Sequence, residues 1–412
     1  MNILYIITKL ELGGAQKVCI SLLDYFQKNS NFAGLISGDQ GVLVDQIKDL
    51  DNIFLLPEFK REVGIKNIFN EFKLFFKLIK IIKENKKKYK NLIVHTHSTK
   101  AGIFGRWAAF FAGVKNRVHT VHGFGFHEGQ NKFVWLIIYL LEFFTAFITT
   151  KFICVSNFDL NTGSRLLPFF KKRSSVINAA VDYEKFYLEK KEIKNFNKNL
   201  NQKFIIGTVS CFKPQKNLID LLQAFKKVLN NITSGERHRF CHTELAVPDE
   251  ALREVWDSAS RNIKFNNILL QIIGDGEQRE YLQDFILKNN LQNNIELLGW
   301  QDNVAKFMHN WDLFALSSLW EGLPCVVVEA RLAKLPVIAY KISGIPEVIF
   351  DNKNGFLIDS GNWEVLAEKI EFIIKDNINR EKLSNYNDNL SMFNNNYMIN
   401  EHLLLYKSVL YT

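Results

Sequence analysis

Short runs of apolar residues alternate along the chain with longer stretches in which apolar positions recur at helical spacing. This alternation is typical of parallel sheets covered by helices on both faces. In the first half, strands are predicted at residues 3–7, 93–96, 118–121, 152–155 and 176–177. After a Lys- and Asn-rich linker at about residues 184–203 the pattern restarts, with strands predicted at residues 204–209, 268–273, 295–298, 313–316 and 336–339. We therefore expect an α/β fold of two doubly wound, Rossmann-like domains that face each other across a cleft.

Ligands of doubly wound sheets bind beyond the carboxyl ends of the strands, so a site is expected in the loops that follow strands. Gly13 and Gly14 follow the first strand and open a helix, where small residues let the backbone approach a ligand. His95, His97 and His122 also lie near strand ends, where a histidine can act on a proton or a hydroxyl. A tight turn and packed histidines are the alternatives. For His122, which two glycines follow closely, we favour function.

The second half has similar loops. Lys213 and Lys216 follow the strand at residues 204–209, where their charges would neutralise a diphosphate. Gly274 and Gly299 follow the next two predicted strands and mark further turns at the same edge of the sheet. Solvated surface lysines are the alternative, but several ligand-compatible loops in one domain favour a site.

Glu321 and Glu329 are the most informative pair in the chain. Gly322 and Pro324 predict a turn after the first carboxylate, and the apolar run that follows predicts a helix that carries the second. Carboxylates accept hydrogen bonds from vicinal hydroxyls, while the free N–H groups of a helix start hold phosphate. These groups together predict binding of a sugar nucleotide, and two solvated acids on a loop and a helix are the alternative.

Composition and cysteine content restrict the class of protein. Hydrophobic residues make up 47% of the chain and charged residues 23%, which is usual for globular proteins. The N-terminus lacks the basic and apolar regions of a signal peptide and is expected to form a buried strand. The cysteines show no Cys-x-x-Cys spacing, so we expect a reducing cytoplasm and neither a disulfide framework nor a zinc site. They are Cys19, Cys154, Cys211, Cys241 and Cys325.

Positive charge is concentrated in the first half. Residues 1–200 contain 30 Lys and Arg against 17 Asp and Glu, within a chain of net charge +9. Residues 66–90 predict a helix with an apolar stripe and a lysine face, which suits an anionic membrane surface. A core-facing helix with solvated lysines is the open alternative, and nucleic acid is not expected because no binding motif accompanies the lysines. The stripe is Ile68, Phe72, Phe75, Phe76, Ile79 and Ile82, and the face is Lys73, Lys77, Lys80 and Lys83.

A second apolar stretch covers residues 133–148 and contains Glu142. It is shorter than about 18 charge-free residues, so a membrane span is not expected. We interpret it as a buried helix or as a helix that enters the membrane interface.

The order of these segments resembles that of the glycosyltransferase family 4 enzymes of GT-B architecture. The resemblance extends over nearly the whole chain and implies sugar transfer from a nucleotide donor with retention of anomeric configuration and without a metal. Asp49 and Asp51 are therefore not interpreted as metal ligands. The segments that carry the resemblance are GGAQ, HGFGF, CVSNFD, VINAAVDYEKF, FKPQKN, IGDGEQREYL, LLGW, SSLWEGLPCVVVEA, SGIPEVI and NGFLI.

The resemblance also implies roles for single residues. Glu329 would accept hydrogen bonds from the donor ribose, Glu321 would contact the donor sugar, and Lys216 would bind the diphosphate. His122 would face the reacting sugar, and the leaving phosphate rather than a protein base would help to deprotonate the incoming hydroxyl. The donor-binding set is completed by Gly13, Gly14, Lys213, Gly274, Gly299, Gly322 and the backbone around Leu323 and Pro324.

The chain departs from the family pattern at two places. Cys211 stands where members commonly carry an arginine, and Lys213 supplies a point charge there rather than a guanidinium fork. Ala179 and Ala180 replace the usual Asn-Gly of the hinge between the domains. The first departure bears on the affinity for the donor, and the second on the hinge alone.

Residues 234–261 differ in composition from the rest of the chain, with four Arg and no Lys, Asn or Ile. We interpret them as an atypical insertion that forms a surface loop with a short helix at residues 249–258, because surface insertions cost little stability. A partner-binding excursion is the alternative. His238, Cys241 and His242 resemble a metal cluster but have no fourth ligand at hand.

The predicted domains are residues 1–185 for the acceptor, residues 186–395 for the nucleotide sugar, and a C-terminal helix at residues 396–412 that packs back on the first domain. The predicted function is retaining transfer of a sugar, with UDP as the commonest donor nucleotide, to a lipid-linked or growing surface glycan such as a capsule, an O-antigen or a glycoprotein glycan. The predicted location is the inner face of the cytoplasmic membrane. A non-hydrolysing UDP-sugar 2-epimerase and a catalytically idle partner in a glycan-assembly complex are the alternatives.

Overall fold

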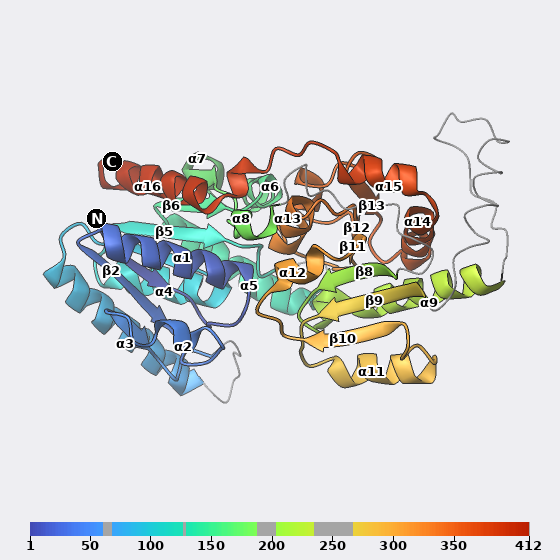
Figure 1. Ribbon diagram of the computed structural model, residues 1–412. Coiled ribbons are helices and arrows are strands. Elements are labelled where there is room, and N and C mark those ends of the chain that lie inside the picture. The colour runs from blue at the N-terminus through green and yellow to red at the C-terminus, as the bar shows by residue number, and fades with distance from the viewer. Residues whose placement is uncertain (61–67, 127–128, 188–202, 235–266, 412) are drawn as a thin grey trace. The chain divides into compact units, whose positions relative to one another are not determined.

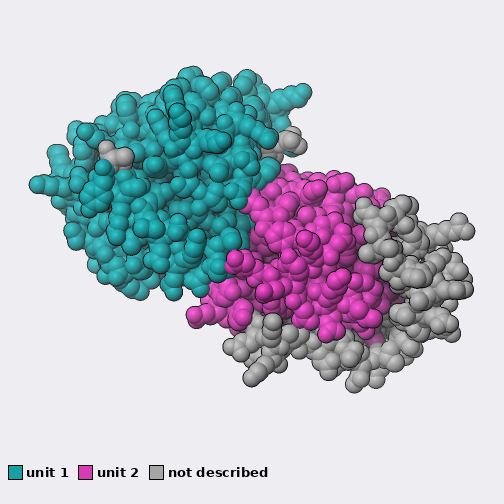
Figure 2. All heavy atoms as spheres, turned by 90° about the horizontal axis from the view of Figure 1, so that it is seen from above, with its two compact units in different colours: residues 1–181, 322–325, 391–412 teal, residues 182–321, 326–390 magenta. Residues whose placement is uncertain are grey.

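The computed structural model describes residues 1–60, 68–126, 129–187, 203–234 and 267–411 (Figure 1). The chain divides into two compact units, which Figure 2 colours separately. Unit 1 comprises residues 1–181, 322–325 and 391–412, and unit 2 comprises residues 182–321 and 326–390. Of the atypical segment 234–261, all but its first residue lies outside the described residues, and so does its candidate metal cluster.

Unit 1 is built on a parallel sheet in the order β3-β2-β1-β4-β5-β6-β7. The apolar runs form its centre, where strands are buried on both faces, as expected for a parallel sheet. The sequence pattern did not predict β2 and β3, which extend the sheet at one edge. The strands are β1 (Asn2–Ile6), β2 (Phe32–Ser37), β3 (Ile53–Leu55), β4 (Ile93–His97), β5 (Asn116–Val121), β6 (Lys151–Cys154) and β7 (Ser174–Val176).

Helices surround the sheet of unit 1 (Figure 1). Gly14, the first residue of α1, follows an extended Gly13, and the C-terminal α16 packs against α1 with the Phe26 and Tyr406 rings 5.4 Å apart. The helical segments of this unit are α1 (Gly14–Asn29), α2 (Val44–Ile47), α3 (Ile68–Lys88), α4 (Thr99–Phe111), α5 (Lys132–Phe147), α6 (Asn157–Leu166), α7 (Phe170–Arg173), the 3₁₀ turn Ser391–Phe393 and α16 (Asn395–Tyr411).

Unit 2 is built on a second parallel sheet in the order β10-β9-β8-β11-β12-β13. Its strands are β8 (Phe204–Val209), β9 (Ile268–Ile273), β10 (Ile295–Gly299), β11 (Leu313–Leu316), β12 (Val337–Tyr340) and β13 (Gly355–Ile358). Its helical segments are α8 (Tyr183–Phe186), the 3₁₀ turn Pro214–Lys216, α9 (Leu218–Ser234), α11 (Arg279–Lys288), α12 (Val304–Met308), α13 (Cys325–Leu332), the 3₁₀ turn Ile345–Glu347, α14 (Trp363–Lys375) and α15 (Asn377–Ser384). The predicted α/β fold class of two doubly wound sheets is confirmed.

Each sheet has one point at which the strand order reverses. In unit 1 the chain runs from β1 outward through β2 to β3 and then crosses to β4 on the other side of β1. In unit 2 it runs from β8 through β9 to β10 and then crosses to β11 on the other side of β8. Loops diverge at such a point and leave room for a ligand at the carboxyl ends of the strands. The loops after β1, β4, β8 and β11 are therefore the expected places for a ligand site.

The amphipathic helix α3 faces the core differently from the prediction. Its buried side is formed by Leu74, Leu78 and Ile82. These residues belong to a hydrophobic core of unit 1 that also includes residues of β1, β2 and β4. Phe72 and Phe76, which the spacing had placed on the apolar stripe, are 59% and 64% exposed. Of the predicted stripe, Ile82 is buried, and Phe75 and Ile79 are partly buried against the same core.

The helix α5 exposes many of its apolar side chains and buries two polar ones. Phe133, Phe144 and Phe147 are at least 50% exposed, whereas Glu142 and Thr145 are buried. The interpretation of this segment as a buried helix is therefore wrong, and the interfacial helix remains. None of the helices in the described residues is long and apolar enough to cross a membrane.

Candidate active site

In unit 1, the candidate residues Gly13 and Gly14 lie after β1, at the start of α1. Gly322 to Cys325 belong to this unit, and the Cys325 Sγ would lie 3.1 Å from a Cβ placed at Gly14. A side chain at position 14 would therefore compete for space with this thiol. The structure brings the first glycine loop and the Gly322–Cys325 segment together.

His122 follows β5 and lies against the same Gly322–Cys325 segment. A Cβ at Gly322 would come within 2.8 Å of the His122 carbonyl oxygen, a distance that no side chain can tolerate. Glycine at position 322 is thus required by the close approach of two backbones. Leu323 is buried beside it, and Pro324 has no N–H of its own, so the backbone donors of this turn come from its neighbours.

His122 forms a hydrogen bond with a second histidine. His97 is the last residue of β4, and its Nδ1 lies 3.0 Å from the Nε2 of His122. Burial, followed by the charge of His402, lowers the pKa of His122 to about 3. Burial also lowers the pKa of His97 well below its usual value. Both side chains are therefore neutral near pH 7, and His122 can donate or accept a hydrogen bond but does not carry a charge.

The His97 ring is supported by a buried polar cluster on the same face of the sheet. The His95 ring lies 4.3 Å from it, centroid to centroid. The Nδ1 of His95 bonds to the Tyr406 hydroxyl at 2.6 Å, and its Nε2 bonds to Thr120 Oγ1 at 2.7 Å. Tyr406 lies on α16, so the C-terminal helix contributes directly to the surroundings of His97.

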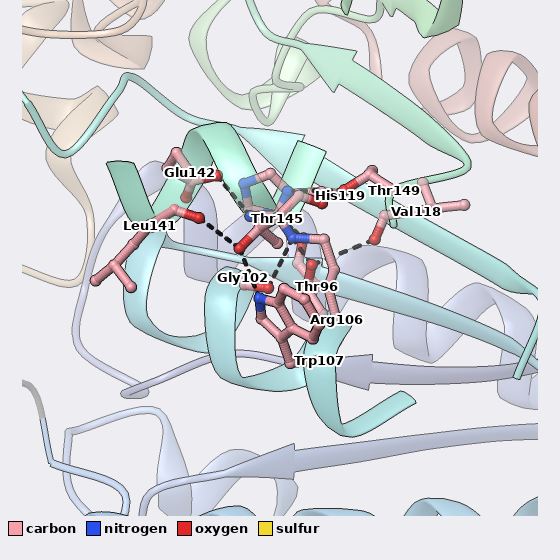
Figure 3. Close-up of polar contacts among 10 residues, drawn as sticks. All are labelled: Thr96, Gly102, Arg106, Trp107, Val118, His119, Leu141, Glu142, Thr145 and Thr149. Carbon is pink, nitrogen blue, oxygen red and sulfur yellow. Dashed lines mark hydrogen bonds and ion pairs between the residues drawn. The ribbon is translucent and has the colours of Figure 1, made fainter. Parts of the chain in front are cut away.

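On the opposite face, Arg106 of α4 and Glu142 of α5 form a buried ion pair (Figure 3). The Arg106 guanidinium donates to Glu142 Oε2 at 2.7 Å and to Thr149 Oγ1 at 3.1 Å, and the two charged side chains are almost fully buried. Glu142 and His122 both line a cavity of about 10 Å³, enough for about one water molecule. The sequence signal for this pair was one acid in the apolar helix α5 and one arginine within the apolar part of α4.

In unit 2, Lys216 and Glu321 meet at the carboxyl edge of the sheet. Lys216 Nζ donates to Glu321 Oε1 in an ion pair whose side chains are 17% and 10% exposed. Gln215 Nε2 donates to the Trp320 carbonyl at 2.7 Å, and the Glu321 N–H donates to Ser343 Oγ at 3.3 Å. The loop after β8 and the loop after β11 therefore hold one another, and a lysine and a carboxylate are placed side by side at the switch point.

Glu329 lies on α13 and is 5% exposed. Pro324 immediately precedes this helix, a place that suits proline because the first N–H groups of a helix have no partner within it. Glu329 is thus held on a buried, regular element, while Glu321 lies on the preceding loop. Their different surroundings are consistent with separate roles.

The remaining predicted residues of unit 2 also lie at this edge. Gly274 follows β9 with a φ of +128°, and its N–H donates to the Gly299 carbonyl at 2.8 Å. A Cβ at Gly274 would lie 1.9 Å from the Ser210 carbonyl oxygen, so only glycine fits. Lys213 precedes the 3₁₀ turn that carries Lys216, and Cys211 occupies the same loop as a half-buried free thiol.

The described residues contain no group of three or more His, Cys, Asp and Glu side chains that could hold a metal ion.

Solved structures of related shape define the class of fold. HepE from Anabaena in complex with UDP-glucose has a TM-score of 0.74 at 18% identity, with 99% of this chain and 100% of that chain covered. A sucrose-phosphate synthase from Thermosynechococcus elongatus has a TM-score of 0.73 at 15% identity, with 99% of each chain covered. Two doubly wound parallel sheets of this kind define the GT-B architecture.

Sequence comparison places the chain within one family. The model for Glycosyltransferase Family 4 matches residues 12–185, and that for Glycosyl transferases group 1 matches residues 248–390. The UDP-Gal:alpha-D-GlcNAc-diphosphoundecaprenol alpha-1,3-galactosyltransferase of Escherichia coli is 30% identical over 371 residues, which are 89% of this chain and 86% of that one. The capsular polysaccharide biosynthesis glycosyltransferase CapM of Staphylococcus aureus is 24% identical, with 88% of this chain and 85% of that one covered. The chain belongs to glycosyltransferase family 4, and it is a glycosyltransferase.

Proposed function

We propose that this enzyme transfers a sugar from a UDP-sugar, with retention of anomeric configuration, to a lipid-linked or growing surface glycan. The observation that carries the donor assignment is the Lys216–Glu321 pair at the switch point of unit 2, with Glu329 on the adjacent helix. A lysine can neutralise a diphosphate, and carboxylates accept hydrogen bonds from sugar and ribose hydroxyls. The Escherichia coli relative is named for a UDP-galactose donor, and the HepE structure is named for bound UDP-glucose.

In the proposed donor complex, Lys216 binds the diphosphate, Glu321 the donor sugar and Glu329 the ribose. Because Lys216 and Glu321 pair with each other in the described structure, donor binding must replace their mutual contact with contacts to the ligand. The diphosphate takes the place of the Glu321 carboxylate as the partner of Lys216. Glu321 then becomes free to accept hydrogen bonds from the sugar.

Catalysis in this proposal depends on positioning and on stabilisation of the departing diphosphate. No metal or other cofactor takes part in it. His122 acts at the reacting sugar as a neutral hydrogen-bonding group, because its low pKa keeps it uncharged near pH 7. The leaving phosphate helps to deprotonate the acceptor hydroxyl on the same face of the sugar, which accounts for retention without a protein nucleophile.

The proposed acceptor is carried by a lipid, and two surfaces of unit 1 support contact with an anionic membrane. On α3, exposed Phe69, Phe72 and Phe76 share one helical face with exposed lysines further along. The lysines of that face are Lys73, Lys80, Lys83 and Lys87. On α5, apolar side chains are exposed along most of the helix. Exposed aromatics beside lysines suit the interfacial region of a bilayer, so we place the enzyme at the inner face of the cytoplasmic membrane.

The test is incubation of the purified enzyme with a panel of nucleotide sugars and native membrane lipids. Appearance of the labelled sugar in the lipid fraction, with its anomeric configuration retained, supports the proposal. Release of a 2-epimer without any acceptor would instead indicate the epimerase. Binding of UDP without turnover on any lipid would indicate the idle assembly partner.

A further inference from the structure

His97 and His122 are brought together by the pairing of two neighbouring parallel strands. His97, at the end of β4, is opposite Thr120 of β5, and His122 follows two residues later. Because side chains on a strand alternate between faces, Thr120 and His122 point to the same side of the sheet as His97. The ring nitrogens meet at 3.0 Å, Nδ1 of His97 against Nε2 of His122.

The bond between these two rings contains a single proton. Burial lowers the pKa of both histidines, so each is neutral and each has one N–H and one unprotonated nitrogen. One ring must therefore donate and the other accept. The choice fixes the tautomer of His122, and with it the group that His122 presents at its second nitrogen.

The surroundings of His97 decide between the two arrangements. Its Nε2 is buried and has no hydrogen-bond partner among the described residues. If His122 donated, His97 would carry its proton on that unpartnered Nε2, and a buried N–H would be left unpaired. If His97 donates from Nδ1, only a lone pair is left there. Orphaned buried N–H groups are rarer in proteins than under-satisfied acceptors, so donation by His97 is favoured.

We infer that His97 is a positioning residue, which donates from Nδ1 to Nε2 of His122 and so holds His122 with its proton on Nδ1. His122 then presents an N–H donor, and not an acceptor, at Nδ1, the ring nitrogen that does not bond to His97. The inference rests on the proposed function only for what that N–H meets, namely an oxygen of the donor sugar. The inference deepens that function, because it specifies that His122 acts on the donor sugar as a hydrogen-bond donor and not as an acceptor.

The tautomer is measured directly by two-bond ¹H–¹⁵N correlation spectra of the whole protein with labelled histidine. The expected result is an unprotonated Nε2 and a protonated Nδ1 on His122. A proton on Nε2 of His122 in the unaltered protein would overturn the inference. This readout does not depend on turnover, so it decides the role of His97 even if no sugar transfer is found.

Two nearly isosteric variants separate positioning from a merely structural role. In His97→Asn the side-chain amide can donate where Nδ1 did, so His122 should keep its proton on Nδ1 and kcat should stay within about threefold. In His97→Asp the carboxylate can only accept, so Nε2 of His122 should become protonated and kcat should fall on the order of tenfold, with KM for the donor little changed. An unprotonated Nε2 in His97→Asp would contradict the inference.

His119→Asn is the matched control. His119 is another buried histidine of the same two strands, but its Nδ1 lies 2.9 Å from Thr96 Oγ1 and it does not bond to His122. This variant should leave the His122 tautomer unchanged. A change there equal to that of His97→Asp would assign the effect to general disturbance of the core and overturn the role of His97.

Discussion

The two units share a doubly wound design but bury ionisable groups in different ways. Unit 1 buries histidines as neutral groups, and the described part of unit 2 has His309 as its single histidine. Unit 2 depends on charged pairs, as in Lys216–Glu321 and Arg331–Asp388, and unit 1 has such pairs as well as its histidines. Burial lowers the pKa of five histidines of unit 1, namely the buried His95, His97, His119 and His402 and the partly exposed His122. Neutral hydrogen bonding suits the unit that is proposed to contact sugar hydroxyls, whereas fixed charge suits the unit that is proposed to hold a diphosphate.

Mild acid is expected to lower the free energy of unfolding of unit 1 more than that of unit 2, and this is the largest expected difference between them. An unfolded histidine has a pKa of about 6.5. In the folded chain, burial lowers the pKa of His122 to about 3 and that of His402 to about 4. Between these values the unfolded state binds more protons, so the free energy of unfolding falls as pH falls. Burial also lowers the pKa values of His95, His97 and His119, so the five contributions act in the same direction and unit 1 is expected to lose more stability than unit 2.

Hydrogen exchange followed by mass spectrometry at pH 7 and pH 5, corrected for the intrinsic rates, measures this loss separately in the peptides of each unit. Protection should fall in unit 1 well before it falls in unit 2. Equal loss in both units would contradict the contrast between buried histidines and ion pairs.

Each unit also contains a deeply buried arginine–carboxylate pair, so matched variants can sharpen the comparison. Arg106→Met leaves Glu142 buried without its cation, and Arg331→Met does the same to Asp388. Each change is expected to lower the free energy of unfolding of its own unit by about 3–5 kcal/mol. Local hydrogen exchange at pH 7 checks this expectation.

The double variant Arg106→Met/Glu142→Leu serves as the control for unit 1. Replacing both charges with apolar groups should recover most of the loss, because no uncompensated charge remains. A double variant as unstable as Arg106→Met would show that the packing of Arg106, rather than its charge, supports the helix pair α4 and α5.

Removal of the lysine from the Lys216–Glu321 pair directly tests the proposed diphosphate contact of unit 2. Lys216→Ala should raise the dissociation constant for UDP by about 10–100-fold, because a charged hydrogen bond to a phosphate is worth about 1.5–3 kcal/mol. Isothermal titration calorimetry measures the affinity. The matched control is Lys288→Ala, which removes an exposed lysine paired with Asp284 in the same unit. If both variants lost UDP equally, Lys216 would have no specific role.

The smallest effects are expected at the surface of α3. Lys80→Ala and Lys83→Ala should each weaken binding to anionic vesicles by about fivefold, since a lysine near such a surface adds about 1 kcal/mol. Added salt should weaken binding in the same direction. Co-sedimentation with vesicles of phosphatidylglycerol and phosphatidylethanolamine measures both effects. Lys288→Ala in unit 2 should leave vesicle binding unchanged, and an equal loss there would remove α3 as the contact surface.

Most strands could be predicted from their apolar runs, including the edge strands β7 and β10, whereas β2, β3 and β13 could not. β3 has only three residues and depends on pairing with β2, while β13 is a short run whose partner β12 decides its conformation. Such strands are stabilised by neighbours that are distant in sequence. Local pattern therefore carries little information about them.

The candidate site was predictable as a set of loops but not as a set of contacts. The resemblance located Lys216 and Glu321, yet their ion pair joins residues 105 positions apart. The bond between His97 and His122 arises only because β4 and β5 are neighbours in the sheet. Glu142 was recognisable as an unusual acid in an apolar helix, but its partner Arg106 became evident only when α4 and α5 were packed together.

The central claim, that unit 2 binds the nucleotide donor through the carboxylate of α13, is tested most directly by calorimetric titration of UDP into the wild-type enzyme and Glu329→Gln. Glu371→Gln, which alters another buried carboxylate of unit 2, is the control for folding. We predict that Glu329→Gln loses at least tenfold in affinity, because the charged acceptor for the ribose hydroxyls is removed, while Glu371→Gln binds as the wild type does. Equal UDP affinity in the wild-type enzyme and Glu329→Gln would contradict the claim.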